Sequence, residues 1–291
     1  MKSLPILVLV LGLSNAALAQ EQRLVHQDVK RKFIVYTPAS YAARPDQRLP
    51  LVVNYHGGGM TMREQMLYTQ MNQAAERGNF IVVYPQGIKN DWNVNLGQDA
   101  KDAVDDIGFT EAMVAKLKLD YRIDARRIYA TGLSRGGFFS LRIAAELPHL
   151  FAAVAVVGAS TPQTVVDQQV KPGRIGVMHI LGTGDDIVAY EGKKGGYLSA
   201  VESHQYWLRN NGMSDAVASE RVIDPDKRDE TEVRHVEAGR DGINVALVTV
   251  KNGGHTWSGA DAFNVGLPLG KTSRDIQANQ VIWDFLSKHG K

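Results

Sequence analysis

Short runs of apolar, often β-branched residues recur along the chain, and between them apolar residues return at helical spacing. Such runs are typical of strands buried on both faces, and the spacing is typical of amphipathic helices. Their alternation predicts the α/β class, with a mostly parallel sheet covered by helices. The expected strands are 32–37, 50–55, 80–84, 127–131, 152–157, 175–181 and 243–250, and the expected helices are 63–77, 108–118, 136–146, 196–210 and 273–288.

One charged, turn-prone segment interrupts this alternation. Residues 224–230 read D-P-D-K-R-D-E and lie between two short extended segments. Proline and aspartate favour turns, so we expect a solvated loop or the tip of a hairpin. No internal repeat or low-complexity linker divides the chain. We therefore expect a single catalytic domain over residues 20–291.

The first 19 residues have the pattern of a secretory signal peptide. Lys2 precedes a short apolar run, and A-L-A at 17–19 supplies the small residues that a signal peptidase recognises. A membrane anchor is the alternative, but the run is shorter than the ~20 residues that span a bilayer. We expect cleavage after Ala19 and a secreted mature protein that has no membrane segment. Because the chain has no cysteine, its fold must hold without disulfides.

The charge balance gives no indication of a polyanionic partner. The chain has 33 Lys and Arg against 31 Asp and Glu, a formal net charge of +2, with no long run of either sign. Nucleic acid and anionic lipid surfaces are bound through clustered basic residues, which this sequence lacks. Small neutral or weakly acidic molecules are therefore the expected ligands.

The strongest chemical signal is G-L-S-R-G at 132–136, between an expected strand and an expected helix. In that setting G-x-S-x-G predicts the nucleophile elbow of an α/β-hydrolase, whose glycines permit a turn that exposes the serine Oγ. A serine hydroxyl needs a neutral imidazole to take its proton and a carboxylate to orient that imidazole. Ser134 is therefore the candidate nucleophile, and the acid and histidine should follow it in that order.

Of the eight histidines, only His56 and His255 lie among glycines directly after an expected strand. His255 stands between the last expected strand and the final helix, where the catalytic base of this fold is expected. The acid should leave the preceding strand, which ends in two adjacent aspartates, Asp185 and Asp186. Spacing alone does not decide between them.

The segment H-G-G-G at 56–59 directly follows the expected strand 50–55 and predicts an oxyanion loop. Glycines let the backbone N–H groups approach the substrate. We expect the backbone amides of Gly58 and Arg135 to bind the oxyanion. The competing interpretation, metal binding by His56, lacks a second ligand at a suitable spacing. We therefore expect His56 to brace the loop and no metal to be bound.

Together these motifs resemble the extracellular polyhydroxybutyrate depolymerase and feruloyl or acetylxylan esterase family of the α/β-hydrolase superfamily. The resemblance extends over nearly the whole chain after residue 19 and includes F-I-V-V-Y-P-Q-G at 80–87 and V-D-D-I-G-F at 104–109. G-T-G-D-D-I-V-A-Y at 182–190 resembles the family's acid loop and aligns Asp185 with the family's catalytic aspartate. The family usually has proline where this chain has Ala189 and Ser258.

The resemblance implies a serine carboxylic-ester hydrolase that acts without a cofactor on feruloyl, acetyl or other short-chain esters. Hydrolysis of polyesters or hydroxyalkanoate oligomers is the alternative, and a peptidase is a weaker one. A non-catalytic binding protein on this scaffold would lack a triad member. Trp92 and Trp257 lie in loops beside the motifs, so we expect them to wall the substrate site, unless they pack in the core. The sequence leaves the oligomeric state open.

Overall fold

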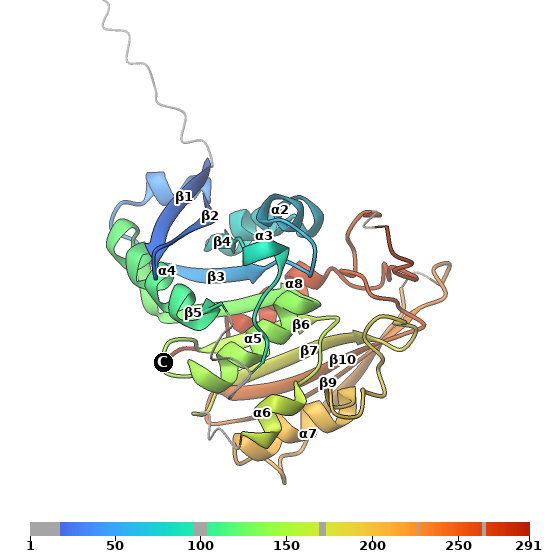
Figure 1. Cartoon of the computed structure of the whole chain (residues 1–291). Coiled ribbons are helices and arrows are strands. Elements are labelled where there is room, and N and C mark those ends of the chain that lie inside the picture. Colours follow the sequence, from blue (N-terminus) through green and yellow to red (C-terminus); the bar gives the residue numbers. More distant parts are fainter. Residues whose placement is uncertain (1–17, 96–103, 169–172, 226, 264–265) are drawn as a thin grey trace, which may run out of the picture.

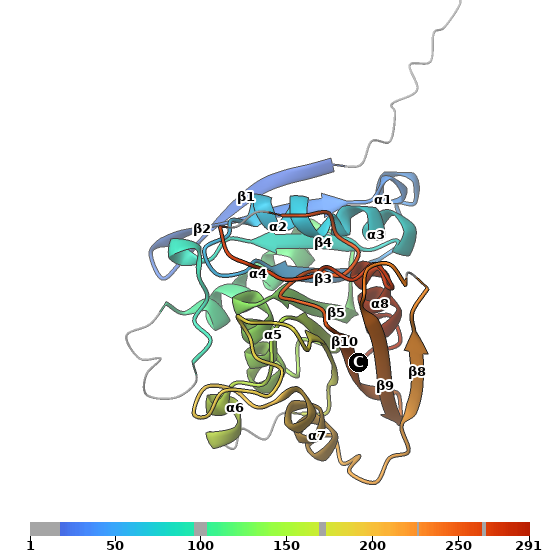
Figure 2. The ribbon, with the colours of Figure 1, turned by 90° about the vertical axis from the view of Figure 1, so that its right-hand side faces the viewer.

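A ten-stranded sheet lies at the centre of the protein, and helices cover both of its faces (Figures 1 and 2). The computed structural model describes residues 18–95, 104–168, 173–225, 227–263 and 266–291, so most of the predicted signal peptide lies outside the described residues. The strands are β1 (Leu18–His26), β2 (Val29–Thr37), β3 (Leu49–Tyr55), β4 (Ile81–Pro85), β5 (Ile123–Leu133), β6 (Ala153–Val157), β7 (Gly176–Gly182), β8 (Ser219–Ile223), β9 (Glu232–Arg240) and β10 (Ile243–Lys251).

The middle of the sheet is parallel and both of its edges are antiparallel. The strands follow one another in the order β1-β2-β4-β3-β5-β6-β7-β10-β9-β8. Every neighbouring pair from β4 to β10 is parallel, whereas β1, β2, β9 and β8 run antiparallel to their neighbours. Parallel neighbours need crossover connections, and helices supply most of them. The predicted α/β class with a mostly parallel sheet is confirmed.

The helices pack against the sheet from both sides (Figure 1). They are α1 (Ala39–Ala43), α2 (Met62–Thr69), α3 (Met71–Gly78), α4 (Asp106–Asp120), α5 (Arg135–Glu146), α6 (Gln163–Asp167), α7 (Ala200–Asn210) and α8 (Ala278–Leu286), with a 3-10 turn, η1, at Ile88–Asn90. Apolar residues of α4, α5 and α7 join the core on one face, and those of α2, α3 and α8 join the core on the other.

Central strands bury both of their faces, which explains why they read as continuous apolar runs. On β3, Leu51, Val53 and Tyr55 point into one core, and Val52 points into the other. All four are at most 1% exposed. A strand that alternated apolar and polar residues would place polar groups in one of these cores. The seven expected strands are all present, with β5 longer than predicted.

Several elements differ from the expectation. The expected helix 63–77 divides into α2 and α3 at Gln70, whose φ of 49° and ψ of 31° lie in the left-handed region. The closing helix covers only Ala278–Leu286. The edge strand β1 was not predicted, and β8 and β9 were expected only as short extended segments, because their exposed positions interrupt the apolar pattern. Residues 224–230 connect the antiparallel strands β8 and β9, which confirms the predicted hairpin tip.

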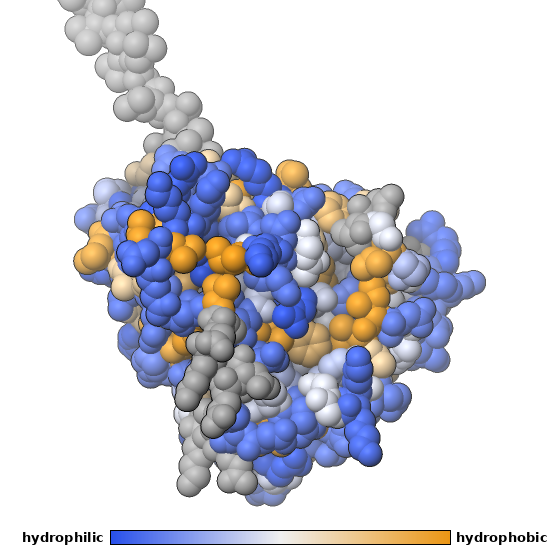
Figure 3. Space-filling view, in the orientation of Figure 1, coloured by the Kyte–Doolittle hydropathy of each residue, from blue (hydrophilic) through white to orange (hydrophobic). Residues whose placement is uncertain are grey.

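On the face shown in Figure 3, the described surface is mainly hydrophilic, and its apolar side chains form short, separate patches. Within the described ranges, no helix combines the length and apolar character needed to cross a bilayer.

A buried polar cluster joins α7 to the sheet. His179 of β7 lies 2.9 Å from the Ser203 hydroxyl, and the Trp207 indole donates to Thr161 Oγ1 at 2.9 Å. Burial lowers the pKa of His179 to about 3 and that of neighbouring His204 to about 4. Both imidazoles are therefore neutral in the folded protein, because no carboxylate of the described residues offsets the cost of a buried cation.

These histidines make the stability of the fold sensitive to acid. Their folded pKa values lie below the ordinary 6.5, so between pH 6.5 and about 4 the unfolded chain binds more protons than the folded one. Their stabilising contribution is complete above pH 6.5 and is lost as the pH falls through this window. We expect the free energy of unfolding, measured with urea, to fall by about 3 kcal/mol or more between pH 7 and 4.

Two histidine variants separate this effect from general acid denaturation. His204→Gln removes one buried imidazole and should flatten the dependence between pH 6.5 and 4. His149→Gln is the matched control, since His149 is exposed, 3.8 Å from Glu111. Equal pH dependence in both variants would contradict the explanation.

Candidate active site

Ser134 lies in a sharp turn between β5 and α5. Its φ of 52° and ψ of −120° are strained for a residue with a side chain, and its N–H donates to Val157 O of β6 at 2.9 Å. The neighbouring glycines leave no room for a Cβ: one on Gly136 would come 2.2 Å from Tyr55 O, and one on Gly132 would come 2.5 Å from Gly136 C. The turn is therefore possible only with these glycines, as the elbow pattern predicts.

Asp185 is the aspartate that faces His255. Its Oδ2 lies 2.6 Å from His255 Nδ1, and its Oδ1 accepts the N–H groups of Ile187 at 2.9 Å and Val188 at 2.8 Å. Both side chains of the pair are almost fully buried, whereas Asp186 is exposed. The structure thus separates the two aspartates that spacing could not, and places Asp185 in the position implied by the resemblance.

The tautomer of His255 follows from this pairing. A carboxylate can only accept, so Nδ1 carries the proton, and Nε2 of the neutral ring is an acceptor. The ring packs tightly over Gly158, where a Cβ would come 2.8 Å from it. The His255 N–H donates to Leu269 O at 2.6 Å, and the Gly254 N–H donates to Lys271 O at 2.8 Å. These contacts fix the histidine loop at the carboxyl end of the sheet.

His56 braces the glycine-rich loop, as expected. Its Nδ1 donates to Gly57 O at 2.8 Å, and its Nε2 accepts the Gly87 N–H at 2.9 Å. Burial lowers its pKa to about 4, so the ring is neutral, which this accepting role requires. The Gly59 N–H donates to Asn90 O at 2.8 Å. The loop is therefore held by the segment after β4.

The expectation that Trp92 and Trp257 wall the substrate site is wrong. Each is only 1% exposed, and neither lines the cavity at Ser134. Trp92 packs edge-on against Tyr55 with ring centres 5.1 Å apart, and its Nε1 donates to His56 O at 2.9 Å. The Nε1 of Trp257 donates to Asn279 Oδ1 at 3.0 Å. Both indoles bury their rings and satisfy their single donor inside the protein, which favours the core position.

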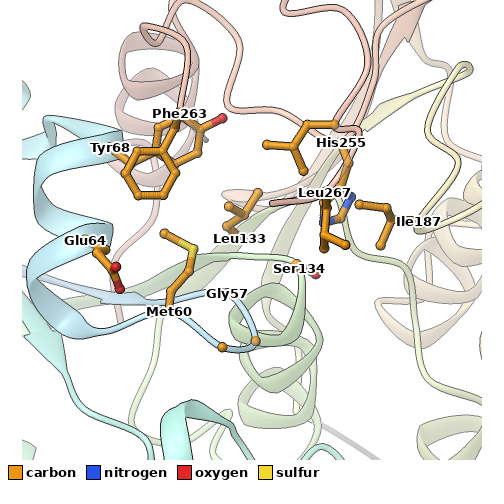
Figure 4. Close-up of a pocket in the computed structure, with 13 residues that line it drawn as sticks. Gly57, Met60, Glu64, Tyr68, Leu133, Ser134, Ile187, His255, Phe263 and Leu267 are labelled. Carbon is orange, nitrogen blue, oxygen red and sulfur yellow. The ribbon is translucent and has the colours of Figure 1, made fainter. Parts of the chain in front are cut away.

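A cavity of about 380 Å³ opens beside Ser134 and His255 (Figure 4). Sequence reasoning missed most of its apolar wall, because Tyr68 comes from α2, and Phe263, Leu267 and Leu269 come from a loop without a chemical motif. The Tyr68 and Phe263 rings stack with their centres 4.8 Å apart. The residues that line the cavity are Gly57, Gly58, Gly59, Met60, Glu64, Tyr68, Leu133, Ser134, Ile187, His255, Phe263, Leu267 and Leu269.

The two backbone amides expected to bind an oxyanion flank this cavity. Gly58 lines it, and Arg135 follows Ser134 at the first turn of α5, where helix N–H groups have no partner within the helix. The stem of the Arg135 side chain lies against Gly58, where an added Cβ would come 2.8 Å from Arg135 Cγ. The Arg135 guanidinium donates to the Asp91 carboxylate at 2.7 and 3.1 Å. Its charge is therefore paired.

Among the described residues, no group of three or more potential metal ligands is present.

Comparison with known proteins identifies esterases. The family model described as "Putative esterase" matches residues 26–221. "Putative esterase NocK" of Nocardia uniformis subsp. tsuyamanensis is 28% identical over 274 residues, which cover 88% of this chain and 79% of that protein. Feruloyl esterase B of Piromyces equi is 28% identical over 77% of this chain, and the match covers 42% of its own length.

Two further matches extend this picture. The bifunctional acetylxylan esterase/xylanase XynS20E of Neocallimastix patriciarum is 25% identical over 90% of this chain. That match covers 34% of its length, so the chain spans less than half of both fungal relatives. The structure of the acetyl xylan esterase from Aspergillus awamori aligns with a TM-score of 0.62 at 16% identity, covering 92% of this chain and 99% of that one. This likeness shows a shared fold.

The family model covers more than half of the chain, and the sheet is that of the α/β-hydrolase esterases. The chain therefore belongs to this esterase family and is a carboxylic ester hydrolase.

Proposed function

We propose that the protein hydrolyses esters through an acyl-enzyme formed on Ser134, with His255 as the base and Asp185 as the acid. One observation carries this proposal: Ser134 and an imidazole held by a buried carboxylate open onto the same cavity. This arrangement supplies a nucleophile, a proton acceptor in a fixed tautomer and a negative charge that stabilises the imidazolium.

In the first step, Ser134 Oγ attacks the ester carbonyl carbon while its proton passes to His255 Nε2. The carbonyl oxygen becomes an oxyanion and accepts hydrogen bonds from the amides of Gly58 and Arg135. His255 then protonates the departing alcohol oxygen as the carbon–oxygen bond breaks. Water, deprotonated by the same imidazole, attacks the acyl-enzyme and releases the acid, and Ser134 recovers its proton.

The geometry of the loops supports the role of the two amides. Within the described ranges, neither the Gly58 nor the Arg135 N–H donates to another protein group. The Arg135 amide lies at the N-terminus of α5, where the helix dipole favours negative charge. His56 and Trp92 hold the backbone of the glycine-rich loop from behind. Donors fixed in advance stabilise a developing charge without reorganisation.

For the substrate, we propose feruloyl, acetyl or other short-chain esters of neutral alcohols. The names of the two fungal relatives support this class, and so does the apolar cavity with its stacked Tyr68 and Phe263 rings. Hydroxyalkanoate oligomers or other polyesters are the second candidate, since their acyl groups are also apolar. A peptidase is a weaker candidate.

We also propose that the protein is exported with residues 1–19 removed. In the structure, Leu18 and Ala19 pair with Thr37 and Tyr36 at the start of β1, so cleavage there shortens this edge strand by two residues. N-terminal sequencing of the exported protein, which should begin at Gln20, tests the proposal.

Ser134→Ala should lower kcat by about 10⁴-fold or more, because Ser134 alone carries the acyl group in the proposed mechanism. Labelling of the protein by a fluorophosphonate should disappear as well. The change removes one oxygen atom, so the urea unfolding midpoint should stay close to that of the wild type. Hydrolysis or labelling that persists in this variant would overturn the proposed nucleophile.

Asp185→Asn should lower kcat by about 10³- to 10⁴-fold, since an amide can favour the wrong tautomer of His255. Asp186→Asn is the matched control, because it makes the same chemical change at the exposed neighbour. We expect it to stay within about threefold of the wild type. A large loss of kcat in Asp186→Asn alone would reverse the assignment.

A substrate panel separates the candidate classes. We expect kcat/KM for methyl ferulate or acetylated xylan to exceed that for soluble 3-hydroxybutyrate oligomers by at least about tenfold. Hydrolysis of an amide such as a p-nitroanilide should be undetectable under the same conditions. Preference for the hydroxybutyrate oligomers would favour the second candidate, and amidase activity would favour a peptidase.

A further inference from the structure

The active-site cavity contains one carboxylate that the acyl-transfer steps do not use. Among the described lining residues, Glu64 is the only acidic or basic side chain apart from His255. The other side chains around it are apolar or uncharged. In Figure 4, Glu64, Tyr68 and Phe263 lie at one end of the cavity, and Ser134, His255 and Ile187 lie at the other.

The carboxylate of Glu64 is held in place by the start of α2. It closes a capping box, in which Glu64 Oε2 accepts the Thr61 N–H at 2.7 Å and the Thr61 hydroxyl at 2.9 Å. Because these bonds tie the carboxylate to the helix terminus, its position is fixed although the residue is exposed. The position of a negative charge at the cavity wall is therefore a property of the fold.

No cation neutralises this charge within the described part of the chain. Glu64 forms no ion pair there, and its chain neighbour Arg63 and the Arg135 that lies against Gly58 both have other partners. Arg63 pairs with Glu21 at 2.9 Å, and Arg135 pairs with Asp91 at 2.7 Å. Lys271 pairs with Glu230 and does not line the cavity. A substrate in the cavity thus meets the negative potential of this carboxylate, which water partly screens.

We propose that Glu64 makes the enzyme select uncharged esters and disfavour esters that carry a carboxylate. This inference rests on the proposed ester hydrolysis and names the property of the substrate that the cavity distinguishes. Feruloyl and acetyl esters of neutral sugars carry no carboxylate, so Glu64 does not repel them. Soluble hydroxyalkanoate oligomers end in a free carboxylate and are repelled. Water partly screens the repulsion between the Glu64 carboxylate and a carboxylate on a bound substrate. We therefore expect kcat/KM to be about three- to tenfold lower for the charged ester than for a matched neutral one.

A matched pair of esters isolates the charge. p-Nitrophenyl hexanoate and mono-p-nitrophenyl adipate share the leaving group and an acyl chain of the same length, and only the adipate carries a terminal carboxylate. The measured quantity is the ratio of kcat/KM for the adipate to that for the hexanoate. In Glu64→Gln, which can keep the capping box, this ratio should rise by about three- to tenfold at low salt.

Two further variants sharpen the test. Glu64→Lys reverses the charge and should raise the ratio further than Glu64→Gln does. Glu202→Gln is the control, since Glu202 closes the equivalent capping box with Ser199 at the start of α7 and does not line the cavity. It should leave the ratio unchanged. Added salt at 0.5 M should shrink the gain, because exposed charges are screened.

The proposal is overturned if both Glu64 variants leave the ratio unchanged, or if they change kcat/KM for the two esters equally. The second result would indicate a structural effect of the helix terminus. Failure of the proposed function gives a different result, because Ser134→Ala would then still hydrolyse p-nitrophenyl hexanoate whatever the ratio is in the Glu64 variants.

Discussion

The close approach of the Ser134 turn to the end of β3 is the constraint on which the site depends. Gly136 lies so near Tyr55 O that a Cβ would come within 2.2 Å of it, and 2.6 Å from His56 O. This contact brings the first turn of α5 against the chain just before the glycine-rich loop. Gly58 and Arg135 come together for the same reason, since the Arg135 stem lies over Gly58. One backbone contact therefore brings together the proposed nucleophile and both proposed oxyanion donors.

The parallel sheet places the remaining groups at the same edge. The carboxyl ends of parallel strands lie on one side of a sheet, so residues that directly follow these strands meet there. Ser134 follows β5, Asp185 follows β7 and His255 follows β10. Asp185 and His255 can then bond directly because β7 and β10 are neighbours. This is why motifs far apart in the sequence could be combined into one predicted site.

Short sequence patterns predicted the parts of the fold that depend mainly on residues close together in the chain. The buried strands, the elbow glycines and the hairpin tip all have short signatures, and each is present. The choice between Asp185 and Asp186 did not follow from spacing, because burial, which only the fold decides, is what separates them.

Trp92 is a second case in which the local sequence did not predict where a side chain lies. It lies in a loop beside a motif, yet its ring packs in the core and its indole N–H is satisfied by His56 O. The break at Gln70 was also invisible, because α2 and α3 together resemble one amphipathic helix. A residue that is not glycine rarely takes the left-handed conformation, so nothing in the local sequence marks the break.

The proposed site has a reactive end and a selective end with different physical origins. The reactive end is built from backbone amides, tight glycine contacts and the buried hydrogen bond between His255 and Asp185, so substitutions there readily disturb the geometry. The selective end is built from side chains of α2 and of the loop that carries Phe263 and Leu267, where Glu64 is exposed. An exposed side chain can change with little cost to the fold. In the proposed mechanism, substrate preference can therefore shift at Glu64 without altering the chemistry at Ser134, which explains why the family resemblance predicts the reaction better than the substrate.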